Sequence, residues 1–137
     1  MTSRGENQYE EIDVLVVEDD EFQRSLIVQA LQVLGFPVIR EAGDGEEGLK
    51  ACVAKLPGLI LCDIEMQPMD GMAFLKALRR TKSAAVREIP IVFLTSHNES
   101  ETVQEAVAAG VDAFIIKPLT LKKLKGRLDA IFANPRF

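Results

Sequence analysis

Five short, mostly apolar runs alternate along this chain with segments whose apolar residues recur every three to four positions. We expect the runs to form strands at residues 12–17, 36–40, 59–63, 89–95 and 113–116. Runs with few polar breaks are typical of strands that are buried on both faces of a sheet. Because strands that alternate with helices pair in parallel through right-handed crossovers, the pattern predicts a doubly wound α/β fold with a five-stranded parallel sheet.

The intervening segments predict five helices, at about residues 22–34, 49–56, 72–78, 100–109 and 121–132. Gly35 and Gly110 follow two of them directly, where a glycine commonly ends a helix. Residues 81–88 are polar and predict a connection without regular structure. Pro37 lies within the second predicted strand, which favours a position at the edge of the sheet.

A chain of 137 residues is long enough to build one domain around a single core. We expect a disordered tail over residues 1–11, a domain over residues 12–133, a short tail over residues 134–137, and no output domain. The net charge of −5, without a basic block, argues against binding to nucleic acid or to an anionic membrane.

Cys52 and Cys62 have neither the spacing of a zinc site nor that of a redox pair, so we interpret both as buried residues of a reduced compartment. The first residues lack the apolar centre of a signal peptide, and no stretch has the length and apolar character of a membrane span. These features predict a cytoplasmic protein.

Polar residues follow four of the five predicted strands. They are Glu18 and Asp19, Asp63, Thr95 and Ser96, and Lys117. The carboxyl ends of parallel strands lie at one edge of a sheet, where ligands of such folds bind. Clustered carboxylates favour a hard cation such as Mg²⁺, and a carboxylate can attack phosphorus as a nucleophile. A lysine and a hydroxyl would then neutralise the oxygens of a transferred phosphoryl group.

Each of these features also has a purely structural explanation. Residues 18–20 suit the start of a helix, because acidic side chains are favourable at that end of the helix dipole. Thr95 and Ser96 would serve as ordinary helix caps, and Lys117 followed by Pro118 would serve as a turn. The occurrence of one partner at each strand end in a single small domain favours the functional interpretation.

Several short motifs occur in a fixed order along residues 12–133. They are Val16-Val17-Glu18-Asp19, Asp63 with Met66 and Met69-Asp70-Gly71, Leu94-Thr95-Ser96, Ala109-Gly110, and Phe114-Ile115-Ile116-Lys117-Pro118. Together they resemble the receiver domains of two-component response regulators, in the single-domain form of the chemotaxis switch protein. The resemblance implies a flavodoxin-like receiver fold with strand order 2-1-3-4-5.

The resemblance also implies a chemical role for Asp63, which would accept a phosphoryl group from a phosphohistidine of a sensor kinase or phosphotransfer protein. Mg²⁺, or Mn²⁺ in its place, would be held by Asp19, Asp63 and the backbone carbonyl of Glu65, with Glu18 acting through water. Glu18 stands where the family also has Asp, and Pro68 lies one place later than in the commonest pattern.

Thr95 and Lys117 would hold the phosphoryl oxygens by the same resemblance, with Ser96 beside them at the end of the strand. The Lys117–Pro118 peptide would be cis. Phe114 occupies the aromatic switch position of the family, and because it has no hydroxyl, a switch that needs a tyrosine hydrogen bond is excluded.

A stand-alone receiver would signal through a protein-binding face, which in the family is the one made here by residues 100–109, 113–116 and 121–131. The last helix carries a group of cations, Lys122, Lys123, Lys125 and Arg127. They would either face an acidic partner or be solvated charge.

Two other functions remain open. A pseudo-receiver would be an interaction module that is never phosphorylated, and it would be expected to have lost one of the site positions. A phosphatase that uses an aspartyl phosphate usually carries a second Asp two residues after the nucleophile, where this chain has Glu65. His97 follows Thr95 by two residues, and we interpret it as an exposed loop residue rather than a catalytic one.

Overall fold

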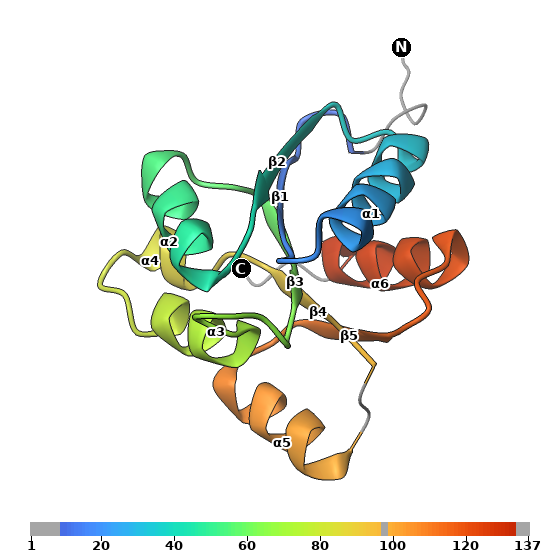
Figure 1. The fold of residues 1–137 in the computed structure, drawn as a ribbon. Helices are drawn as coiled ribbons and strands as arrows, with labels where there is room; N and C mark the ends of the chain where they lie inside the picture. Colours follow the sequence, from blue (N-terminus) through green and yellow to red (C-terminus); the bar gives the residue numbers. More distant parts are fainter. Residues whose placement is uncertain (1–8, 97–98, 134–137) are drawn as a thin grey trace.

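Five parallel strands form one sheet in the order β2-β1-β3-β4-β5 (Figure 1). The computed structural model describes residues 9–96 and 99–133. The strands are β1 (Asp13–Val17), β2 (Val38–Ala42), β3 (Leu59–Asp63), β4 (Ile91–Thr95) and β5 (Ala113–Ile116). All residues of β3 and β4 are buried, whereas β2 lies at an edge and is partly exposed. The predicted fold class, the strand order and the edge position of the second strand are therefore confirmed.

Helices cover both faces of the sheet. α1 (Glu21–Leu34) and α6 (Leu121–Ala133) lie on one face, and α2 (Gly45–Ala54), α3 (Gly71–Arg79) and α5 (Ser100–Ala109) lie on the other (Figure 1). Successive strand residues point to opposite faces, so Leu15 and Val17 pack in the core beneath α2, α3 and α5, while Val16 packs in the core beneath α1 and α6.

The described residues form six helices rather than the predicted five. The additional helix, α4 (Ala84–Arg87), is a single turn within the segment 81–88 that was expected to be an irregular connection. It begins at Ser83, whose hydroxyl accepts a hydrogen bond from the Val86 N–H at 3.3 Å. A segment this short shows no apolar periodicity, so only its cap marks it in the sequence.

The second strand begins at Val38 instead of residue 36. Gly35 has a φ of 107°, and the Phe36 N–H donates to the Leu31 carbonyl at 3.1 Å. This pairing is the usual way in which a left-handed glycine closes a helix, and it leaves the Phe36 side chain buried in the core. Phe36 therefore belongs to the end of α1 and not to β2.

Residues 9–11 belong to the segment expected to be a disordered tail, but the structure describes them and Tyr9 packs against the domain. Tyr9 is buried, its ring stacks on Phe36 with centroids 4.5 Å apart, and it also contacts Phe132. Its hydroxyl donates to Asp129 Oδ1 at 2.9 Å. These contacts join the start of the described chain to the last helix. Residues 1–8 and 134–137 lie outside the described residues.

Arg79, at the end of α3, joins four segments on the side of the sheet covered by α3 and α5. Its guanidinium donates to the carbonyl of Gly110 at 2.8 and 3.1 Å, and to the carbonyls of Arg87 and Ile89 at 2.8 Å. It also pairs with Asp112 Oδ2 at 3.0 Å. The end of α5 is therefore fastened to α3, to α4 and to the entry into β4.

None of the helices that the structure describes is long and apolar enough to span a bilayer.

The Tyr9 contacts predict a measurable contribution to stability. Tyr9→Ala removes a buried aromatic ring and should lower the free energy of unfolding by about 3 kcal/mol. Tyr9→Phe keeps the stack on Phe36 and loses only the hydroxyl, so it should cost about 1 kcal/mol. Urea unfolding followed by circular dichroism measures both values. A Tyr9→Ala variant as stable as the wild type would show that these contacts do not form in solution.

Candidate functional site

The polar residues that follow the strands lie together at the carboxyl edge of the sheet. The pairing of β1, β3, β4 and β5 places Glu18, Asp63, Thr95 and Lys117 at successive strand ends. Glu18, Asp63 and Thr95 are 1%, 5% and 1% exposed, although all three are polar. Buried groups of this kind need partners, and the site is built from the contacts that provide them.

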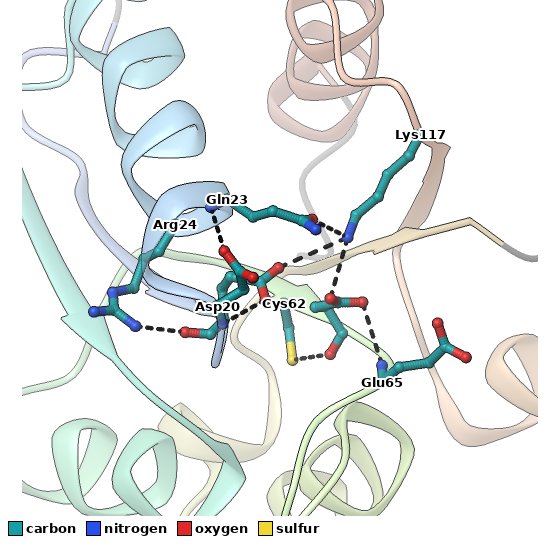
Figure 2. A network of polar contacts seen from close by, with 8 residues as sticks. Asp20, Gln23, Arg24, Cys62, Glu65 and Lys117 are labelled. Carbon is teal, nitrogen blue, oxygen red and sulfur yellow. Dashed lines mark hydrogen bonds and ion pairs between the residues drawn. The ribbon is translucent and has the colours of Figure 1, made fainter.

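Lys117 is the cation at the centre of the site (Figure 2). Its Nζ donates to Asp63 Oδ2 at 3.1 Å and lies 3.7 Å from Glu18 Oε1. It also donates to the side-chain oxygen of Gln23, in the first turn of α1, at 2.6 Å. One ammonium is thus shared between two buried carboxylates and a neutral amide.

Asp63 is held at both oxygens. Its Oδ1 accepts a hydrogen bond from the Glu65 N–H at 3.2 Å, and its Oδ2 accepts the bond from Lys117. The loop that follows is closed by Gly71, whose N–H donates to the Ile64 carbonyl at 2.8 Å. A Cβ at Gly71 would lie 2.4 Å from the Asp63 carbonyl oxygen, so the start of α3 can approach this loop only through a glycine.

Glu18, Asp19 and Asp63 form a group of three carboxylates whose nearest oxygens all lie within 4.8 Å of one another. The pKa of Glu18 is raised from 4.5 to about 8, mainly by burial and also by the neighbouring Asp63 carboxyl, although the Asp20 N–H and Lys117 lower it. Glu18 Oε1 is buried and accepts no hydrogen bond from the described residues. Among the described residues, the ammonium of Lys117 compensates one of these charges, so the group carries an excess of negative charge when its carboxyls are ionised.

This set of donors fits a divalent cation. Hard carboxylate oxygens are the ligands of Mg²⁺, and one buried oxygen of Glu18, a member of this group, accepts no hydrogen bond from the described residues. Asp19 is exposed, and it borders a cavity of about 360 Å³ that is also lined by Glu65 and Asp70. The cation would therefore be open to solvent on one side, as the strong hydration of Mg²⁺ requires.

The structural explanation of the acidic cluster applies to Asp20 alone. Its Oδ1 accepts a hydrogen bond from the Gln23 N–H at 2.9 Å and caps α1. Glu18 instead uses its Oε2 to accept from the Asp20 N–H at 3.0 Å. Capping therefore occupies one of the three acidic side chains and leaves Glu18 and Asp19 at the site.

The remaining predicted residues lie around this centre. Ser96 is exposed at the end of β4, and the Thr95 carbonyl accepts from the Lys117 N–H at 2.8 Å. Phe114 is half-buried and makes an edge-on contact with Phe93, with ring centroids 5.8 Å apart. The Lys117–Pro118 peptide is cis. His97 lies outside the described residues.

Both cysteines are buried free thiols. Cys62 precedes Asp63, and its thiol donates to the Asp63 carbonyl at 3.1 Å. Burial raises the pKa of the Cys62 thiol well above its usual range, and burial raises that of Cys52 to about 11. Neither is a reactive thiolate, which agrees with their interpretation as core residues.

Gln23 is the site residue that the sequence did not predict. It is an exposed residue in the first turn of α1, and no motif or apolar pattern in the sequence marks it. Gln23 and Lys117 also border a groove of about 560 Å³ whose other lining residues are mostly apolar, among them Phe22, Leu26 and Leu121.

The sequence profile of the response regulator receiver domain family matches residues 14–129, so this chain belongs to that family. It is 38% identical over 126 residues to a probable chemotaxis protein CheY of Rhizobium etli, covering 90% of this chain and 94% of that protein.

Two solved structures are similar throughout. Chemotaxis protein CheY4 of Vibrio cholerae matches with a TM-score of 0.80 and 29% identity, over 88% of this chain and 98% of the other. A CheX–CheY–BeF₃–Mg²⁺ complex from Borrelia burgdorferi matches with a TM-score of 0.81 and 25% identity, over 90% of each chain.

The carboxylate group predicts that Mg²⁺ stabilises the folded protein. At a Mg²⁺ concentration ten times its Kd the gain should be about 1.4 kcal/mol, because the unfolded chain has no assembled site. Asp19→Ala should remove most of this gain. The neighbouring change Asp20→Asn keeps a helix cap and should leave the gain intact. Thermal unfolding with and without Mg²⁺ measures the effect, and an Asp19→Ala variant with a full response would exclude Asp19 as a ligand.

Proposed function

We propose that this chain is a phosphorylation-dependent signalling receiver in which Asp63 accepts a phosphoryl group from a phosphohistidine of a kinase or phosphotransfer protein. The observation that carries the proposal is the position of Asp63, which lies between the Glu65 N–H and the Lys117 ammonium and beside two further carboxylates. Family membership supports the same reaction class, and the Borrelia burgdorferi structure contains a CheY chain with BeF₃ and Mg²⁺.

In the transfer, an Asp63 oxygen attacks the donor phosphorus. The phosphorus–nitrogen bond of the phosphohistidine breaks, a phosphorus–oxygen bond to Asp63 forms, and the imidazole leaves with the electron pair and takes up a proton. Lys117 lies within hydrogen-bond distance of the attacking carboxylate, so its charge can pass to the oxygens of the incoming group. Thr95, buried at the next strand end, would supply a hydroxyl to the same group.

Mg²⁺, held by Asp19, Asp63 and the Glu65 carbonyl and by Glu18 through water, would supply charge neutralisation at the phosphoryl oxygens. Without it the three carboxylates would repel a phosphate dianion, and Lys117 alone would carry one compensating charge. The residues around Asp63 would therefore orient this acceptor. The negative charge of the three carboxylates would make phosphoryl transfer depend on a bound cation. Mn²⁺ would suit the same oxygen ligands.

The signal would leave through the face made by α5, β5 and α6. Phe114 would link this face to the site. It lies on β5, three residues before Lys117, and its ring packs edge-on against Phe93 in the core. Lys123 donates to the carbonyls of Ile116 and Pro118 at 3.0 and 3.1 Å, and Arg127 donates to the carbonyl of Phe114 at 2.9 Å.

The basic side of α6 is therefore partly engaged by the backbone of the edge strand β5. An acidic partner would compete for these cations, and their exposure leaves them accessible to it. The family and the reduced cysteines support action in the cytoplasm. The chain would act as a phosphoacceptor, with self-phosphorylation from small donors and self-dephosphorylation as its only chemistry.

Incubation with acetyl phosphate and Mg²⁺, followed by intact-mass measurement, tests the proposal. The wild type should gain one phosphoryl group, Asp63→Asn should gain none, and the matched control Asp20→Asn should be labelled like the wild type. Chelation of Mg²⁺ should abolish labelling. A wild type that stays unmodified at saturating Mg²⁺ would point to a pseudo-receiver, and equal labelling of Asp63→Asn would move the acceptor elsewhere.

A further inference from the structure

The shortest polar contact of Lys117 is with Gln23 and not with a carboxylate. The Nζ lies 2.6 Å from Gln23 Oε1, 3.1 Å from Asp63 Oδ2 and 3.7 Å from Glu18 Oε1. Opposite charges attract more strongly than a charge and an amide, so this order of distances requires a geometric cause.

The cause is that both ends of the contact are fixed by the backbone. The Gln23 N–H is held by the cap residue Asp20 at 2.9 Å, which sets the first turn of α1. The Lys117 N–H is held by the Thr95 carbonyl at 2.8 Å, which sets the end of β5. The side chains of Gln23 and Lys117 therefore start from fixed backbone positions and meet at the site (Figure 2).

We propose that Gln23 is a positioning residue for phosphoryl transfer, which holds the Lys117 ammonium at the entrance of the site so that it does not pair fully with Asp63. The inference rests on the proposed function. A lysine ammonium has three donors, and an acceptor at Gln23 occupies one of them without adding negative charge. A carboxylate at the same place would repel the anionic donor as well as attract the lysine.

The consequence concerns the nucleophile. Without the Gln23 oxygen, the ammonium has only the carboxylates as partners and moves toward Asp63 and Glu18. A carboxylate that is tightly paired attacks phosphorus more slowly, and the ammonium is then withdrawn from the incoming oxygens. In the reaction with acetyl phosphate, the phosphorus–oxygen bond to acetate breaks as the bond to Asp63 forms, and acetate leaves as the anion.

The test compares labelling rates with acetyl phosphate and Mg²⁺. Gln23→Met keeps the length of the side chain and removes the acceptor, so its rate constant should fall by about three- to tenfold, the size of one ordinary hydrogen bond. The matched control is Gln29→Met, because Gln29 is an exposed glutamine on the same helix that lines the same groove. It should label at the wild-type rate.

A double-mutant cycle separates positioning from a general structural effect. Gln23→Met should have no further effect in a Lys117→Met background, because the contact is already lost there. The Nζ resonance of Lys117, assigned by its absence in Lys117→Met, should shift in Gln23→Met and stay in place in Gln29→Met.

Three results would overturn the inference. They are a Gln23→Met rate equal to that of the wild type, an equal loss in both backgrounds of the cycle, and an unchanged Lys117 resonance. If the wild type itself takes up no phosphoryl group, the proposed function fails and this inference fails with it. A labelled wild type with an equally labelled Gln23→Met refutes only the role of Gln23.

Discussion

Two carboxylates, Glu18 and Asp63, are buried side by side and share one ammonium. Removing such charges from water costs several kcal/mol for each ion, and this cost raises the pKa of Glu18 to about 8, so its neutral form is favoured when no cation is bound. The sheet imposes this arrangement, because β1 and β3 are neighbours whose carboxyl ends coincide, and the apolar strands on either side supply the stability that allows it. A cation bound beside these carboxyl groups would offset the cost of ionising both of them.

The acidic segment after β1 contributes both to the start of α1 and to the candidate site. Asp20 caps α1 and fixes Gln23, while Glu18 and Asp19 face the site. Gly71 also serves both the fold and the candidate site, because the absence of a side chain lets α3 begin directly against the carbonyl of Asp63. The starts of α1 and α3 are therefore positioned by residues that also lie at the candidate site. A substitution at the site would shift the start of these helices as well.

The sequence predicted the strands and the group at the strand ends, because burial on both faces leaves apolar runs and parallel strands place their ends together. The strand order was predicted by the family resemblance alone. The sequence did not predict α4, whose single turn is too short for periodicity, or the burial of Tyr9, which depends on Phe36 and Phe132 from distant parts of the chain. Gln23 was missed because an exposed glutamine on a helix carries no signal until its partner is placed in space.

The Arg79 contacts determine which end of α5 could move if Thr95 were displaced. Gly110, at the end of α5, is clamped to α3 and to the entry of β4, and Ala106 is buried close by. The other end of α5 begins at Ser100, a few residues beyond Thr95, and is exposed. The Gly110 end of α5 is therefore held by more contacts than the Ser100 end. A displacement that starts at Thr95 would move the Ser100 end most and the Gly110 end least.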